Sequence, residues 1–158
     1  MKRTPIKRIT VFLFLLGIVG AFAVDVRPQP TTTKPPTKKE RREAEKLIKQ
    51  AETAFNQKNY QAAVRGYAAG LAIVPANPDA HYDKGRAHFN LGEFDQAAKE
   101  FSLALQQGKK PQQAVLILRW DAYDKLKRYD DALADVKAIL ASDPQNQRLQ
   151  LAAARLNY

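Results

Sequence analysis

The stretch that decides the fold is YQAAVRGYAAGL at residues 60–71, which returns as FDQAAKEFSLAL at residues 94–105. An offset of 34 residues superimposes an aromatic, an alanine and a second aromatic, in the pairs Tyr60 and Phe94, Ala63 and Ala97, Tyr67 and Phe101. A third copy lies 35 residues further on, because the loop before it holds one extra residue, and it carries Tyr129, Ala132, Val136 and Leu140. The spacing of three and seven residues from the first aromatic places these side chains on one face of a helix.

Loop signals recur where each helix pair should end. Asn77-Pro78 and Asp143-Pro144 each combine a capping side chain with a proline suited to the first helical position, and Pro111 marks the start of the third pair. The alanine of each copy lets two helices approach closely, and the aromatic fills their junction. From Glu43 onward the chain is therefore predicted to consist of helix pairs.

This pattern resembles the tetratricopeptide repeat, a 34-residue helical hairpin. The family signature falls on Leu47, Ala51, Tyr60, Ala63, Tyr67, Gly70 and Pro75; on Gly85, Phe94, Ala97, Phe101 and Ala104; and on Leu116, Tyr123, Tyr129, Ala132 and Pro144. The resemblance implies an all-α fold, a right-handed superhelical array of about three helix-turn-helix hairpins plus a C-terminal capping helix. The repeat domain would span residues 43–158, with repeats at 44–77, 78–111 and 113–146 and the capping helix at 144–157.

Three positions depart from the family pattern. Lys109 replaces the usual loop proline, Trp120 stands at a small-residue position, and Ile139 replaces the last alanine. A tryptophan at a helix crossing must either splay the hairpin or point into a neighbouring space. The third repeat is therefore expected to be the irregular one.

The first 42 residues have a different character. A basic start (Lys2, Arg3, Lys7, Arg8) precedes 16 uncharged residues, ITVFLFLLGIVGAFAV, and this leader at residues 1–24 reads as a signal peptide ending at Ala21-Phe22-Ala23 or as a retained signal anchor. Either reading predicts export across the inner membrane, with the protein periplasmic or anchored there. Residues 25–42, rich in proline, threonine and basic residues, are predicted to be a disordered linker.

Charge and composition exclude several classes of function. Residues 1–42 hold ten Lys+Arg against two acids, whereas residues 43–158 hold 16 against 14. The net charge of +10 therefore belongs mostly to the leader and linker, which argues against a nucleic-acid partner. Because there is no cysteine, thiolate chemistry, disulfides and a lipid anchor on cysteine are excluded.

No catalytic or metal-binding motif stands out. His81 and His88 are seven residues apart on one predicted helix, about 10.5 Å of rise, which is too far for one metal ion. A zinc-protease motif, a phosphate-binding glycine loop and a nucleophile elbow are all missing from the sequence. The chain is therefore predicted to be no enzyme, with no cofactor, no metal and no small-molecule substrate.

The family resemblance also implies a binding surface. In this family the first helix of each repeat lines a concave groove, and the matching positions here include Ile48, Glu52, Phe55, Asn56, Tyr82, Arg86, Phe89, Asn90, Asp121 and Asp124. A segment with an apolar anchor and some basic character would fit this mixture. Phe55 and Phe89 can equally be core residues between hairpins. The family's carboxylate clamp is not expected, because its cation positions hold Ile48, Ala114 and Leu118, and Glu52 takes the place of its asparagine.

The predicted function is a non-enzymatic adaptor that holds a protein or peptide partner, in envelope assembly or secretion. Two alternatives remain. The chain could be a structural module that stacks on its own copies, or an accessory protein that contacts the membrane or cell wall through its basic linker. For the last alternative Lys38, Lys39, Arg41 and Arg42 would touch anionic head groups or an acidic partner.

Overall fold

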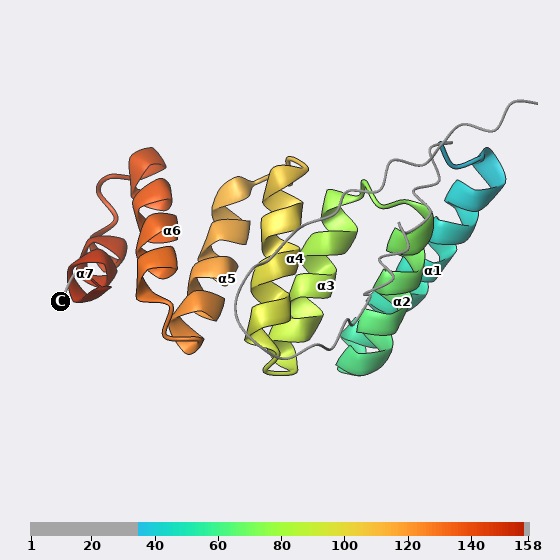
Figure 1. The fold of residues 1–158 in the computed structure, drawn as a ribbon, viewed down its shortest axis with the longest axis horizontal. Coiled ribbons are helices and arrows are strands. Elements are labelled where there is room, and N and C mark those ends of the chain that lie inside the picture. Colours follow the sequence, from blue (N-terminus) through green and yellow to red (C-terminus); the bar gives the residue numbers. More distant parts are fainter. Residues whose placement is uncertain (1–34, 157–158) are drawn as a thin grey trace, which may run out of the picture. The chain divides into compact units, whose positions relative to one another are not determined.

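A computed structural model describes residues 35–156, and within that range the chain forms seven helices and no strand. The helices are α1 (Lys38–Asn56), α2 (Tyr60–Ile73), α3 (Pro78–Asn90), α4 (Phe94–Gln106), α5 (Gln112–Lys125), α6 (Tyr129–Ser142) and α7 (Gln147–Leu156). Figure 1 shows them arranged in chain order along the longest axis of the molecule. The predicted all-helical array of hairpins is confirmed.

The helices form three hairpins and a final single helix. The pairs α1–α2, α3–α4 and α5–α6 pack most closely, and each hairpin contacts the next through α2–α3 and α4–α5. The first helices of the hairpins also touch in sequence, α1 with α3 and α3 with α5, so these three make one layer. Helix α7 packs on α6 and closes the C-terminal end of the array.

The domain begins earlier than the sequence predicted. Residues 38–42, assigned to the disordered linker, form the first turns of α1. The cause is a capping box: the Thr37 side chain accepts a bond from the Glu40 amide, and the Glu40 carboxylate accepts one from the Thr37 amide at 2.7 Å. These two residues satisfy backbone groups that a helix start would otherwise leave open, and so they allow a strongly basic segment to become helical.

The last helix begins later than predicted. Asp143-Pro144 does not start a helix; α7 begins at Gln147, after the Asn146 side chain, which accepts a bond from the Leu149 amide. Asn77-Pro78, by contrast, acts as the sequence indicated, with Asn77 capping α3 and Pro78 in its first turn. The expected capping helix therefore exists, but it starts three residues after Pro144.

All three hairpins turn in the same way. Lys58, Gly92 and Lys127 occupy the equivalent turn position and all have positive φ, at 60°, 77° and 58°. Each turn also closes with a backbone bond from the third residue after the helix end back to the helix, as in the bond from the Asn59 amide to the Ala54 carbonyl at 2.9 Å. Only the second repeat uses glycine for this left-handed conformation.

The core follows the repeat pattern. Ala63, Ala97 and Ala132 are fully buried, and beside them lie the large side chains of Tyr67, Phe101 and Val136, each no more than 1% exposed. Helix crossings are tight: a Cβ atom added to Gly85 would lie 2.7 Å from the Phe101 ring. The small residues seen in the sequence are therefore required by the approach of the paired helices.

Trp120 points toward the neighbouring helix, one of the two outcomes expected from its sequence position. It packs with a cluster of apolar side chains from α5, α6 and α7, namely Leu116, Val136, Ile139, Leu140, Leu149, Ala153 and Leu156. The bulky Ile139 at a small-residue position is fully buried in the same cluster. The irregular third repeat thus builds its own core around the last helix.

The leader at residues 1–24 and most of the linker lie outside the described residues. Among the helices of residues 35–156, none combines the length and the apolar character needed to cross a membrane.

Replacing Lys127 by glycine should raise the free energy of unfolding by about 0.5 kcal/mol. The left-handed conformation costs a lysine roughly 1–2 kcal/mol, whereas the greater freedom of glycine in the unfolded chain costs about 0.5–1 kcal/mol. Urea unfolding of the domain measures the change. Lys137→Gly, an exposed site inside α6, is the matched control and should lower the stability by about 1 kcal/mol. A loss of stability in both variants would contradict the turn assignment.

Candidate functional site

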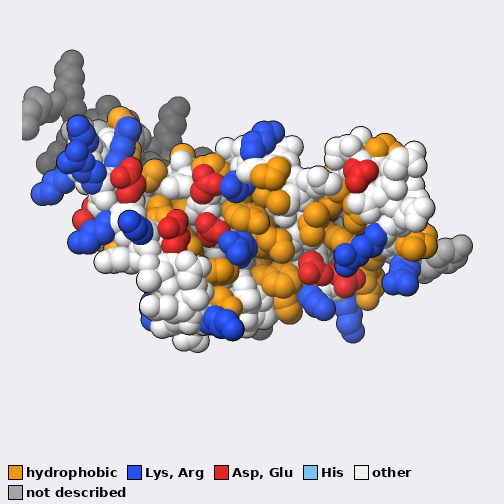
Figure 2. Space-filling view, turned by 180° about the vertical axis from the view of Figure 1, so that it is seen from behind, with side chains coloured by type: hydrophobic (Ala, Val, Ile, Leu, Met, Phe, Trp, Pro, Cys, Tyr) orange, Lys and Arg blue, Asp and Glu red, His pale blue; other side chains and the backbone are white. Residues whose placement is uncertain are grey.

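The residues predicted to line a groove lie on α1, α3 and α5, the layer formed by the first helices of the hairpins. We call this the α1–α3–α5 surface. The Figure 2 view shows hydrophobic side chains gathered over the middle of one face of the molecule, with acidic and basic side chains beside them. The ten predicted residues divide into an aromatic and cationic centre, side chains that pack into the core, and exposed polar groups.

The centre is a stack that joins α1 to α3. The Arg86 guanidinium lies 4.6 Å from the centre of the Phe55 ring and 5.7 Å from that of Tyr82. It also donates a hydrogen bond to the Asp83 carboxylate at 2.9 Å. All three predicted residues are half-buried. Because a cation over aromatic faces is attracted to the ring electrons, the stack holds neighbouring repeats together and presents a rigid surface.

Three predicted residues contribute to the core as well. Phe55 and Phe89 each make an edge-to-face pair with the first aromatic of the following helix, Tyr60 at 5.3 Å and Phe94 at 5.2 Å. Ile48 is half-buried against α2, where its side chain approaches Gly70. Substituting any of these three therefore tests stability together with binding.

The remaining predicted residues are polar and exposed: Glu52 and Asn56 on α1, Asn90 on α3, and Asp121 and Asp124 on α5. The Asn90 side-chain amide donates a hydrogen bond to the Arg86 backbone carbonyl at 2.8 Å. The carboxylates of Glu52, Asp121 and Asp124 form no ion pair with any residue between 35 and 156. The α1–α3–α5 surface therefore carries uncompensated negative charge on both sides of its aromatic centre.

The negative charge of this surface affects the pKa of the buried Tyr67 hydroxyl. Burial raises the pKa of its hydroxyl, and the carboxylates of Asp83 and Glu52 raise it further, against a smaller opposite effect of Arg86. The hydroxyl consequently stays protonated at any physiological pH. The carboxylates of α1 and α3 thus reach the same buried group and belong to one electrostatic environment.

Two ion pairs inside the hairpins were not predicted. Lys84 pairs with Glu100 at 2.8 Å, and one repeat later Arg119 holds Asp135 through two nitrogens at 2.5 and 2.9 Å. Arg119 also donates to the Ser102 hydroxyl of α4 at 2.9 Å. Burial alone would lower the pKa of Arg119, but the hydrogen bond and charge of Asp135 outweigh it and raise the pKa.

The signal for these pairs was present in the sequence. Both the cations and the carboxylates recur at the repeat offset of 35 residues, so an alignment of charged as well as apolar positions would have found them. The pairs lock the second and third hairpins internally, and we assign them a structural role.

The two histidines are buried and each contacts a carboxylate. His81 lies 2.7 Å from Glu100, and His88 lies 2.5 Å from Glu93. Within residues 35–156 no group of three or more His, Asp or Glu side chains could hold a metal ion. Each histidine therefore satisfies the hydrogen-bonding needs of a carboxylate inside the second hairpin.

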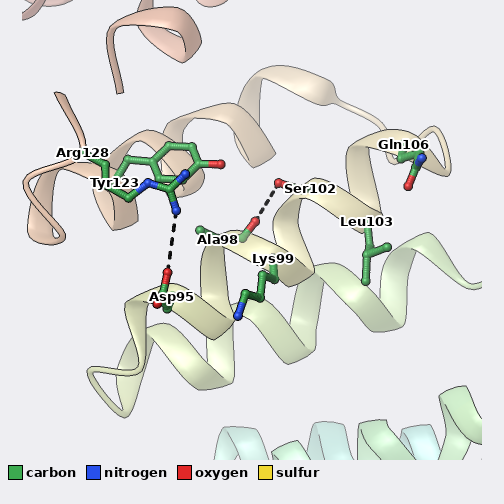
Figure 3. A pocket seen from close by; sticks show the side chains of 8 residues that line it. All are labelled: Asp95, Ala98, Lys99, Ser102, Leu103, Gln106, Tyr123 and Arg128. Atoms are coloured by element: carbon green, nitrogen blue, oxygen red, sulfur yellow. Dashed lines mark hydrogen bonds and ion pairs between the residues drawn. The ribbon is translucent and has the colours of Figure 1, made fainter. Parts of the chain in front are cut away.

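A pocket of about 470 Å³ lies away from every predicted groove residue (Figure 3). Its lining residues are Asp95, Ala98, Lys99, Ser102, Leu103 and Gln106 of α4, with Tyr123 and Arg128 from the α5–α6 hairpin. Arg128 covers the Tyr123 ring at 4.7 Å and pairs with Asp131 at 2.7 Å. Its cation is therefore already engaged, and the pocket offers mainly a shallow apolar wall.

Sequence reasoning also missed the contribution of α7. Asp121 lines a smaller pocket together with residues of α5 and α7, so the α1–α3–α5 surface borders the last helix.

Comparison with known proteins agrees with this geometry. The family model described as tetratricopeptide repeat matches residues 54–119. The chain is 27% identical over 103 residues to the translocon at the outer membrane of chloroplasts 64 from Pisum sativum; the match covers 65% of this chain but only 17% of that protein. Residues 54–119 thus match the tetratricopeptide repeat, as the sequence resemblance indicated.

Solved structures show the same fold. The TPR domain of Arabidopsis OM64 matches with a TM-score of 0.63 and 26% identity, over 74% of this chain and 96% of that one. The second TPR domain of human RPAP3, solved with the HSP70 peptide SGPTIEEVD, matches with a TM-score of 0.64 and 18% identity, over 75% and 98%. Tetratricopeptide domains generally mediate protein–protein interactions.

Replacing Asp124 by phenylalanine should stabilise the third repeat. Asp124 stands where Phe55 and Phe89 stand in the other repeats, and the ring that it would cover, Tyr129, is 48% exposed. An edge-to-face pair there should raise the free energy of unfolding by about 1 kcal/mol, as measured by urea unfolding. Asp121→Phe, one turn earlier on α5, is the control and should give no gain. Equal effects of both changes would refute the idea of a missing ring pair.

Proposed function

We propose that the chain is a non-enzymatic adaptor that binds a peptide segment of a partner protein on the α1–α3–α5 surface. The observation that carries the proposal is the rigid stack of Phe55, Arg86 and Tyr82, flanked by carboxylates that have no partner among the described residues. An apolar or aromatic side chain of the ligand would pack beside the half-buried rings. Basic side chains of the ligand would pair with the free carboxylates.

Relatives support the binding of a peptide by this chain, but they do not indicate the charge of that peptide. The human RPAP3 domain was solved with an acidic HSP70 peptide. In this chain the surface positions near the N-terminal end hold Ile48 and Glu52, an apolar and an acidic residue. A ligand that brings several carboxylates to this end would meet negative charge, so a basic segment fits better here.

The cellular setting is also a proposal, supported by the leader at residues 1–24. A basic start, a 16-residue uncharged stretch and an Ala-Phe-Ala exit favour export across the inner membrane, with the domain periplasmic or tethered to the membrane. We propose a role in envelope assembly or secretion on this basis. N-terminal sequencing of the protein from its native membrane and soluble fractions would show whether the leader is removed.

The exposed basic residues of the first turns of α1 offer a second contact. Lys38, Lys39, Arg41 and Arg42 are all solvent-exposed, and as part of a helix they are held together on a fixed backbone. They would add attraction to an anionic membrane surface if the leader is retained. This contact would orient the adaptor and does not compete with ligand binding on the α1–α3–α5 surface.

The proposal is tested with end-blocked peptides that carry a leucine and a phenylalanine flanked by lysines, asparagines or aspartates. The lysine peptide should bind tightest in fluorescence anisotropy. Glu52→Gln and Asp121→Asn should each weaken it by about twofold to fivefold, since exposed ion pairs contribute roughly 0.2–1 kcal/mol each. Both variants should keep the helical circular dichroism of the parent chain.

Asp130→Asn, an exposed carboxylate on α6, is the matched control and should leave the affinity unchanged. Binding of the three peptides with equal affinity, or an equal loss in the control, would rule out recognition by this surface. Truncation of Tyr82 or Phe89 is a poorer test, because both pack against the core of the second hairpin.

A further inference from the structure

Two adjoining pockets lie between α5 and α7, at the C-terminal end of the same layer. One, of about 210 Å³, is lined by Gln113, Ile117, Trp120, Asp121, Asn146, Arg148 and Leu149. The other, of about 290 Å³, is lined by Trp120, Arg148, Leu151, Ala152 and Arg155. Trp120 and Arg148 line both, so the two pockets are adjacent, and we call them together the α5–α7 site.

The α5–α7 site exposes large apolar side chains. Leu151 is 63% exposed and Ile117 is 41% exposed, and the two stand on either side of the half-buried Trp120. Leu149, two residues earlier on α7, is only 5% exposed and packs into the core beneath the site. A terminal helix that merely covered the array would carry polar groups on its outer side. The exposed leucine beside a tryptophan instead indicates a place for another apolar side chain.

The arginines of the α5–α7 site have no ion-pair partner in the part of the chain that the structure describes. Three arginines of the hairpins have carboxylate partners: Arg86 pairs with Asp83, Arg119 with Asp135, and Arg128 with Asp131. Arg148 and Arg155 form no ion pair with any residue between 35 and 156. The pocket that both of them line contains no carboxylate, and Asp121 lies only in the wall of the other pocket.

We infer that the α5–α7 site binds an acidic segment that carries an apolar side chain. The inference rests on the proposed function, because the site continues the α1–α3–α5 surface past its last carboxylates. Arginine guanidinium groups bind carboxylates through paired hydrogen bonds, and the apolar side chain of the ligand would pack on Trp120 and Leu151. The carboxylates of Glu52, Asp121 and Asp124 and the arginines of α7 would then fix the direction in which one peptide lies along the layer.

Charge argues against a second copy of the chain as the occupant. The other exposed end of the array, α1, holds six Lys+Arg against four Glu, and α7 holds two arginines and no acid. Stacking α7 of one copy on α1 of the next would bring two positive helices together. An acidic partner is therefore favoured over self-association.

Trp120 makes the test direct, because it is the only tryptophan in the chain. The probes are the end-blocked peptide GDELFEDG, its uncharged form GNQLFQNG and its basic form GKKLFKKG, titrated into the protein while tryptophan emission is recorded. The acidic peptide should change the emission and bind at least about tenfold tighter than the uncharged one, as charge-assisted hydrogen bonds allow. Raising the salt concentration should weaken it.

Variants then assign the binding to the site. Arg148→Gln with Arg155→Gln should weaken the acidic peptide about tenfold, whereas Arg65→Gln, an exposed arginine on α2, should leave its affinity unchanged. Asp121→Asn should strengthen the acidic peptide while weakening the basic one. Unchanged binding in the double variant, or equal affinity for acidic and uncharged peptides, would overturn the inference.

The outcome also separates this inference from the function on which it rests. If the basic peptide still binds and remains sensitive to Glu52→Gln while the acidic peptide leaves Trp120 emission unchanged, only the α5–α7 site is refuted. If neither charged peptide binds better than the uncharged one, the proposed adaptor function falls as well.

Discussion

Everything in this molecule depends on how closely the two helices of each hairpin approach. In the first hairpin a Cβ atom on Gly66 would lie 2.8 Å from that of Ala51, and in the second a Cβ on Gly85 would meet the Phe101 ring at 2.7 Å. Such close crossings need small residues on one side and a single large side chain beside them. The repeated Tyr67, Phe101 and Val136 supply that side chain, and their burial gives each repeat its own small core.

The three hairpins solve the same packing problem with different residues. The position of Gly66 in the first hairpin is taken by Glu100 in the second and by Asp135 in the third, and each of these carboxylates finds a cation on the partner helix. A buried carboxylate is costly unless it is paired, so the cation and the acid must change together. Along the array the hairpins therefore shift from purely apolar contact to contact fixed by ion pairs.

This shift has consequences for the surface. In the third repeat Trp120 occupies the small-residue position and reaches toward α7, while Asp124 replaces the ring that would cover Tyr129. The aromatic ring that is half-buried in the first two repeats, as Tyr60 and Phe94, is thus 48% exposed in the third, as Tyr129. The surface also changes sign, from the carboxylates of Glu52, Asp121 and Asp124 to the arginines of α7, none of which has an ion-pair partner among residues 35–156. A layer with this gradient is suited to an extended ligand held in one direction.

The sequence by itself determined the class of fold, the three hairpins and the side chains of the core, because a 34-residue period with aromatics and alanines at fixed places has only one way to be buried. It also placed ten candidate residues on the first helices of the hairpins. Tertiary structure decided which of them are free: Phe55 and Phe89 pair with rings of the next helix, whereas Glu52 and Asp121 face solvent.

Tertiary structure alone showed that Arg148 and Arg155 have no ion-pair partner among the described residues 35–156, since pairing depends on atoms from helices far apart in the chain. It also set both ends of the domain. Thr37 and Glu40 cap α1 inside a segment whose composition predicts disorder, and Asn146 starts α7 after a proline that was expected to start it. Composition reports the average preference of a segment, but one or two hydrogen bonds at a helix end decide where the helix begins.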